Sequence, residues 1–158
     1  MLVLVFHLGD DKYIVKHEKV KEISPMVMLK KIPHSPAYFA GLFNYRGLIV
    51  PVIDLCQLIQ KRFCQMRLST RIIIVESDLK NDAPEIFGFM AERVTDAIRK
   101  PENAFVSPSI KMPGASILGD FVMEQEKMIP CIDLNKLSNQ MHQLHWVENH
   151  ISHVSNAD

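Results

Sequence analysis

The 158-residue chain has 47% hydrophobic and 23% charged residues, an ordinary globular composition that predicts one compact domain with room for two lobes. Its 18 Lys and Arg residues balance 18 Asp and Glu residues, so the formal net charge is zero. Basic runs go no further than pairs such as Lys30-Lys31 and Lys61-Arg62, which disfavours nucleic acid and anionic membrane as partners.

Residues 1–6 are apolar but lack the basic residues and the small-residue cleavage site of a signal peptide, so they predict a first β-strand. No stretch approaches the ~20 apolar residues that span a bilayer, because Pro51 and Asp54 interrupt the longest candidate, residues 48–55. We therefore expect a soluble, cytoplasmic protein with no direct membrane insertion.

Three cysteines (Cys56, Cys64 and Cys131) make an odd count, and none of their spacings is that of a zinc knuckle or a redox CxxC pair. They predict reduced, mostly buried thiols. We expect no metal and no cofactor.

Short runs rich in Val, Ile and Phe, closed by Gly, Pro, Asp or Asn, predict a mainly β fold. Short helical turns are expected at 19–23, 35–40 and 55–61, the last capped by Asp54. The one substantial helix is C-terminal, with Asp133 as its N-cap and an apolar stripe of Leu134, Leu137, Met141 and Leu144. The expected strands are 2–8, 12–17, 27–32, 41–45, 48–54, 71–76, 86–91, 94–98, 116–123 and 127–132.

Two blocks of the sequence recur in the same order. Residues 13–22 align without gaps on 87–96, and residues 51–58 align on 130–137, where the Pro, Ile, Asp and both Leu positions are identical. The repeat predicts two copies of one β unit, each closed into a small barrel because an open five-stranded sheet would leave two exposed edges. The expected subdomains are approximately 13–70 and 71–132, with exchange of strands between them left open.

One stretch carries a family resemblance. Residues 32–55 contain Ile32-Pro33, Asn44-Tyr45-Arg46-Gly47 and Pro51-Val-Ile-Asp-Leu55, and they resemble the signature of the CheW-like coupling proteins of bacterial chemotaxis. Upstream Val20-Lys-Glu-Ile23 is similar to another element of that family, as are residues 87–94 and 117–137. Tyr45, Ala91 and Glu92 depart from the usual family residues.

The resemblance implies a single CheW-like domain over residues 1–144, built from two SH3-like five-stranded β-barrel subdomains, with residues 145–158 as a C-terminal tail. It implies a non-enzymatic signalling adaptor. Such proteins couple the cytoplasmic tips of methyl-accepting chemoreceptors to a CheA-type histidine kinase through the CheW-like regulatory domain of the kinase.

Six residues are the candidate partner-binding site: Val20, Glu22, Ile23, Asn44, Arg46 and Gly47. Asn44 and Gly47 suit the turn of a hairpin, where a structural role is at least as well supported as a contact role. A turn does not need a guanidinium, so the resemblance implies receptor coupling for Arg46, with an ion pair to Glu22 as the alternative. Val20 and Ile23 either line a receptor groove or belong to the core.

The remaining patterns disfavour other functions. His142, His145, His150 and His153 could share a helix face, but the polar end of the chain and the lack of a suitably spaced Cys or carboxylate argue against a metal site. The sequence contains no GxSxG, P-loop, GxGxxG or HExxH motif, so we expect no enzymatic activity. The alternatives are a CheW-like scaffold of a type IV pilus or cyclic-nucleotide pathway, a peptide-binding barrel outside chemosensing, an enzyme hidden in a barrel and an oligonucleotide-binding barrel.

Overall fold

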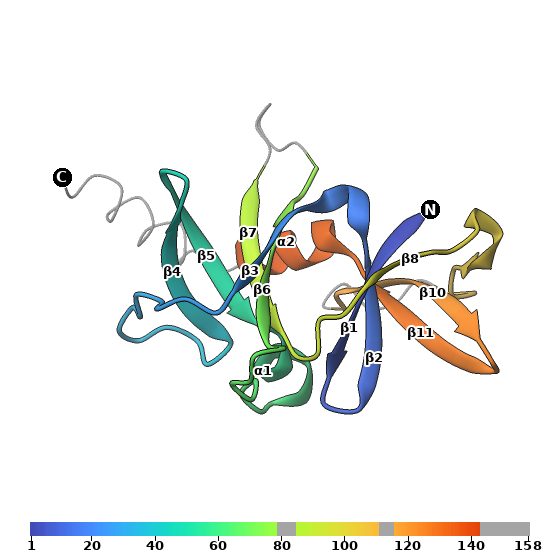
Figure 1. The fold of residues 1–158 in the computed structure, drawn as a ribbon, viewed down its shortest axis with the longest axis horizontal. Helices are drawn as coiled ribbons and strands as arrows, with labels where there is room; N and C mark the ends of the chain where they lie inside the picture. The colour runs from blue at the N-terminus through green and yellow to red at the C-terminus, as the bar shows by residue number, and fades with distance from the viewer. Residues whose placement is uncertain (79–84, 111–115, 143–158) are drawn as a thin grey trace.

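The computed structural model describes residues 1–78, 85–110 and 116–142, which form two curled β-sheets side by side (Figure 1). The sheets confirm the predicted fold class, a mainly β protein with two SH3-like subdomains, short helices and a C-terminal helix. The six-stranded sheet has the order β8-β1-β2-β11-β10-β9 and the five-stranded sheet has the order β3-β6-β7-β5-β4.

The six-stranded sheet takes its strands from both ends of the chain. These are β1 (Leu2–Leu8), β2 (Asp11–Lys16), β8 (Ala97–Arg99), β9 (Phe105–Val106), β10 (Leu118–Glu124) and β11 (Lys127–Ile132). The five-stranded sheet contains β3 (Val20–Pro25), β4 (Phe39–Tyr45), β5 (Leu48–Asp54), β6 (Arg71–Glu76) and β7 (Ile86–Ala91). Each sheet therefore contains strands from both of the expected subdomains, residues 13–70 and 71–132, between which an exchange of strands was left open.

The repeated blocks pair crosswise, which explains this mixing. In the five-stranded sheet β5 runs parallel to β7, and Val52 lies opposite Gly88. In the six-stranded sheet β11 runs parallel to β2, and Cys131 lies opposite Ile14. Val52 and Cys131 occupy the same position of one repeated block, and Gly88 and Ile14 occupy the same position of the other. Each half of the chain thus contributes one block to each sheet.

Strand β1 is buried on both faces, which accounts for its unbroken apolar run. Val3 and Val5 pack inside the six-stranded sheet with Ile14, Val122 and Ile129. Leu4, Phe6 and Leu8 point the other way, into a larger core shared with the five-stranded sheet and the C-terminal helix. Because successive strand residues face opposite sides, one segment stabilises the interior of one lobe and the junction between the two.

Both main helices begin at the predicted aspartates. In α1 (Leu55–Gln60) the Asp54 carboxylate accepts a hydrogen bond from the Gln57 backbone N–H at 3.1 Å. In α2 (Leu134–His142) the Asp133 carboxylate accepts from the Asn135 and Lys136 N–H groups at 3.0 and 3.1 Å. Of the predicted apolar stripe, Leu134, Leu137 and Met141 are buried in the main core, and Leu144 lies outside the described residues.

Several local predictions were wrong. Residues 20–25 are the edge strand β3, preceded by a 3-10 helix at His17–Lys19, where a helical turn over 19–23 was expected. Residues 27–32 are not a strand, because only Lys30 pairs with a neighbour, Leu42. No helix forms at 35–40, and of the predicted strand 94–98 only the last two residues fall in a strand, β8. A second 3-10 helix spans Glu102–Ala104.

The Lys30 bridge helps to curl the five-stranded sheet. Lys30 N–H donates to the Leu42 carbonyl at 2.7 Å, and Leu42 N–H donates to the Lys30 carbonyl at 2.9 Å. This close approach requires glycine at position 41, since a Cβ there would lie 2.8 Å from both Leu29 Cβ and the Lys30 carbonyl oxygen. The φ angle of Gly41 is +146°, which residues with a side chain rarely adopt. The segment after β3 therefore closes against β4 at the other edge of the sheet.

Candidate partner-binding surface

The turn between β4 and β5 holds three of the predicted site residues. Tyr45 pairs with Leu48, so Arg46 and Gly47 form a two-residue loop. Their φ angles of +51° and +89° are those of a type I′ turn, whose twist matches that of the flanking strands. The Asn44 side-chain oxygen accepts a hydrogen bond from the Gly47 N–H at 2.8 Å. Asn44 and Gly47 thus perform the turn role considered for them.

Arg46 projects from this turn and its side chain is 77% exposed. Its Nη2 atom lies 3.5 Å from a carboxylate oxygen of Glu22, and its guanidinium carbon lies 5.4 Å from the centre of the Tyr45 ring. Both contacts orient the side chain, yet an ion pair this exposed contributes only about 0–1 kcal/mol to folding. Most of the guanidinium surface remains available to a partner.

Glu22 lies on β3. Its contact with Arg46 therefore places the predicted site residues of β3 next to those of the β4–β5 turn, and together they form one polar corner of the surface. Val20 and Ile23, on the same strand, are partly buried and pack against the main core. A register shift between Val20 and Glu22 marks a β-bulge at this point of the strand. The structure therefore brings together Glu22, Asn44, Arg46 and Gly47, while Val20 and Ile23 chiefly serve packing beneath them.

An apolar groove, which the sequence did not predict, lies elsewhere on the five-stranded lobe. Its volume is about 720 Å³, and residues from 26–40 and 63–66 form much of its lining. Met28 is 98% exposed, Phe63 66% and Met66 67%, and all three border the groove. Flexible methionines beside an aromatic ring are typical of surfaces that bind protein partners. The groove is formed by loops distant in sequence, so no local pattern indicated it.

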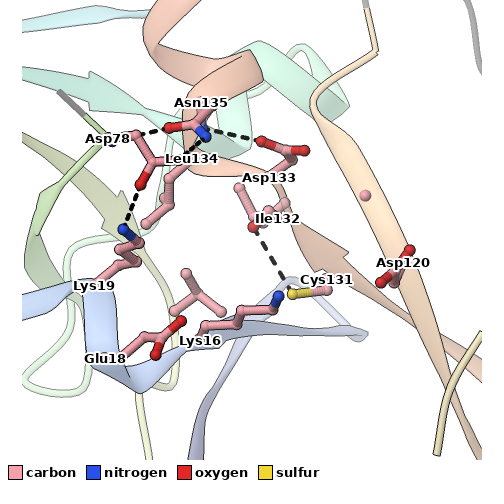
Figure 2. Close-up of a pocket in the computed structure, with 12 residues that line it drawn as sticks. Lys16, Glu18, Lys19, Asp78, Asp120, Cys131, Ile132, Asp133, Leu134 and Asn135 are labelled. Carbon is pink, nitrogen blue, oxygen red and sulfur yellow. Dashed lines mark hydrogen bonds and ion pairs between the residues drawn. The ribbon is translucent and has the colours of Figure 1, made fainter. Parts of the chain in front are cut away.

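A polar cleft of about 370 Å³ lies where the 3-10 helix at His17–Lys19 faces the first turn of α2 (Figure 2). Asp78 lies between Lys19 Nζ at 2.5 Å and the Asn135 side-chain amide at 2.6 Å. The hydrogen bond from Lys19 lowers the pKa of Asp78, and the same bond raises the pKa of Lys19. These contacts tie the 3-10 helix before β3 and the segment after β6 to α2, and they favour a structural role for the cleft.

Glu92 is the most heavily hydrogen-bonded carboxylate described for the chain. One oxygen accepts from Arg62 Nη2 and the Gly9 N–H, both at 2.7 Å. The other accepts from Arg62 Nη1 at 3.2 Å and the Gln65 N–H at 2.6 Å. The Arg62 hydrogen bonds are the main reason why the pKa of this nearly buried carboxyl falls to about 2. Glu92 thereby anchors residues 62–65 to the β1–β2 turn.

The described part of the chain contains one group of three side chains whose metal-ligand atoms lie close together. A carboxylate oxygen of Asp54 and the sulfurs of Cys56 and Cys64 lie within 4.8 Å of one another, and all three residues are buried. Both Asp54 oxygens already accept backbone hydrogen bonds, from Gln57 and Cys64. Of the four histidines considered for a metal site, His142 contacts Glu85, and the other three lie outside the described residues.

Comparison with known proteins agrees with this architecture. The crystal structure of the scaffolding protein TtCheW from Thermoanaerobacter tengcongensis superposes with a TM-score of 0.70 and 28% identity, covering 84% of each chain. The chemotaxis protein CheW of Klebsiella aerogenes is 28% identical over 146 residues, 85% of this chain and 79% of that protein. A probable chemotaxis protein CheW of Rhizobium etli is 26% identical over 131 residues, 83% of this chain and 77% of that protein.

The paired, curled sheets and the exposed hairpin corner define a two-lobed protein of SH3-like barrels. A family model described as CheW-like domain matches residues 2–141. The chain belongs to this family of chemotaxis adaptor and scaffold proteins. Among residues 1–78, 85–110 and 116–142, no helix has the length and apolar character needed to span a membrane.

Proposed function

We propose that this protein is a cytoplasmic, non-enzymatic adaptor that couples the tips of methyl-accepting chemoreceptors to a CheA-type histidine kinase. The main support is the exposed Arg46 guanidinium, held at the tip of a rigid turn in a chain of the CheW-like family. Five N–H donors in a fixed plane suit the carboxylates and backbone carbonyls of a helical receptor tip. The nearby Glu22 supplies an acceptor for a basic residue of the same partner.

A bridging protein needs two surfaces that can be occupied together. We assign the receptor to the polar corner of Glu22 and Arg46, and the CheW-like regulatory domain of the kinase to the apolar groove around Met28, Phe63 and Met66. Apolar and aromatic side chains predominate at the centres of stable interfaces, whereas charged groups give orientation and specificity. The two surfaces are built from different side chains, which allows each to be disabled separately.

Calorimetric titration against a receptor-tip fragment tests the first assignment. Arg46→Ala and Arg46→Glu should weaken binding by about 1–3 kcal/mol, the range for a lost hydrogen bond to a charged group. Arg99→Glu is the matched control, because Arg99 is also exposed but lies on β8 of the other sheet. Equal affinity of the wild type and both Arg46 variants would remove Arg46 from the interface.

Phe63→Asp tests the second assignment. The variant should lose binding to the kinase regulatory domain and keep its affinity for the receptor tip, while Arg46→Glu shows the opposite pattern. If Phe63→Asp binds both partners normally, the groove is not the kinase surface.

A related pathway is the alternative. The Myxococcus xanthus relative named Protein FrzA is 29% identical over 69 residues, 44% of this chain and 43% of that protein. A CheW-like scaffold of a non-flagellar chemosensory pathway would use the same two surfaces. Deletion of the gene followed by separate assays of swimming and surface motility distinguishes the two.

A further inference from the structure

Two buried cysteines lie side by side beneath the apolar groove. Cys56 is in the first turn of α1, Cys64 follows in the loop after that helix, and their sulfurs lie within 4.8 Å of each other. Asp54 holds both segments in place, since one oxygen caps α1 and the other accepts the Cys64 N–H at 3.0 Å. A disulfide requires the sulfurs to approach to about 2.05 Å, so its formation needs side-chain rotation and a shift of the loop that carries Cys64.

The two thiols differ in access. Cys64 lines the groove of about 720 Å³, and its thiol donates to the Met90 carbonyl at 3.7 Å. Cys56 does not reach that lining and its side chain is fully buried. A small thiol reagent that enters the groove therefore meets Cys64 first, and Cys56 stands behind it as the second sulfur of the pair.

We propose that Cys56 and Cys64 form a dithiol that a low-molecular-weight disulfide such as glutathione disulfide converts to an intramolecular disulfide. The Cys64 thiolate attacks one glutathione sulfur, the glutathione S–S bond breaks and the first glutathione leaves. The Cys56 thiolate then attacks the Cys64 sulfur of the mixed disulfide and releases the second glutathione. The two cysteines lose two electrons and two protons, and glutathione disulfide gains both.

The environment makes this reaction slow as well as specific. The adjacent Cys56 thiol and burial both raise the pKa of Cys64, so the thiolate that attacks a disulfide is scarce at neutral pH. The third cysteine, Cys131, lies in the other sheet, opposite Ile14, where it has no neighbouring cysteine. Oxidation should therefore link one specific pair and leave Cys131 reduced.

The disulfide would act on the groove. Phe63 and Met66 flank Cys64 in sequence and border the groove with largely exposed side chains. A bond between Cys64 and α1 fixes the segment that carries these two residues to a helix packed against the core. Amide exchange in residues 61–67 should be slower in the oxidised protein than in the reduced one.

Peptide mapping of the full chain tests the proposal. After equilibration with glutathione disulfide, free thiols are alkylated and the protein is digested with trypsin, which places Cys56 in residues 47–61, Cys64 in 63–67 and Cys131 in 128–136. The expected result is peptide 47–61 joined to 63–67 by a disulfide, with Cys131 alkylated. Cys131→Ser should give the same linked pair.

Two further variants make the outcome decisive. Cys56→Ser should stop at a single glutathione on Cys64, and Cys64→Ser should form no intramolecular disulfide, with a melting curve confirming that each variant is folded. The proposal is overturned if the folded wild type leaves both cysteines unlinked after prolonged equilibration. It is equally overturned if Cys131 appears in the linked product.

Discussion

Glu22 and Arg46 lie 3.5 Å apart although β3 and the β4–β5 hairpin occupy opposite edges of the five-stranded sheet. The sheet must curl for these edges to meet, and the bridge between Lys30 and Leu42 likewise joins the segment after β3 to β4. The ion pair therefore sits where the curled sheet closes. Its exposure distinguishes it from the buried contacts that hold the lobe together.

The first prediction separates stability from binding at this pair. Arg46→Glu should change the free energy of unfolding by less than about 1 kcal/mol, because the pair is exposed and screened by solvent. The charge swap Glu22→Arg with Arg46→Glu restores the internal ion pair but not the outward charge pattern. Urea unfolding should give near-wild-type stability for the swap, whereas its affinity for a receptor tip should stay low. Recovery of affinity in the swap would assign the pair a purely structural role.

The second prediction concerns Gly41. Gly41→Ala places a Cβ against Leu29 and the Lys30 carbonyl at a φ that alanine rarely adopts, so it should destabilise the fold by at least about 2 kcal/mol. Gly47→Ala is the matched control, because its φ is also positive but no atom lies within 4 Å of the added Cβ. Its cost should be about 1 kcal/mol. Equal urea midpoints for the two variants would contradict the close-approach explanation.

The third prediction concerns the pH dependence set by Glu92. Its pKa is about 2 in the folded protein against an ordinary 4.5, so the folded state favours the ionised carboxylate. The resulting stability is fully present above pH 4.5 and is lost as the pH falls toward 2. Glu92→Gln should be about 1–3 kcal/mol less stable than the wild type at pH 7. The two proteins should converge at the acid end of that range, as measured by urea unfolding at successive pH values. A difference that stays constant with pH would show that the charge of Glu92 does not matter.

The fourth prediction compares the two helix caps. Asp54→Ala should cost more stability than Asp133→Ala, because buried Asp54 also accepts the Cys64 N–H, whereas half-buried Asp133 only caps α2. Loss of a cap costs about 0.5–2 kcal/mol, and leaving a buried donor without its partner adds about 1–3 kcal/mol. Thermal or urea unfolding of both variants measures the difference. Equal losses would imply that the Cys64 hydrogen bond contributes nothing.

Features that depend on local sequence were the most predictable. The repeated Pro-x-Ile-Asp-Leu blocks placed both helix starts correctly, and the Arg46-Gly47 pair located the hairpin turn. Strand β3 was missed because the bulge between Val20 and Glu22 breaks the alternation of a regular strand, so Val20 and Ile23 both pack inward although they are three residues apart. Residues 27–32 have a strand-like composition, yet Met28 is almost fully exposed.

Features that depend on assembly of distant segments were not predictable in this way. The crosswise pairing of β5 with β7 and of β11 with β2 follows from no single segment, although the repeat identified the blocks that pair. The proximity of Cys56 to Cys64 depends on the path of the loop after α1 and on the Asp54 hydrogen bond that fixes it. Sequence spacing alone indicated only reduced, mostly buried thiols.

The most direct test of the adaptor proposal is a three-component sedimentation assay. Receptor cytoplasmic fragments are attached to vesicles, the kinase is added with or without this protein, and the kinase that pellets is measured. We predict that the kinase pellets with the receptors only when this protein is present, that Arg46→Glu reduces the amount that pellets and that Arg99→Glu leaves it unchanged. Equal pelleting of the kinase with and without this protein would contradict the proposed coupling function.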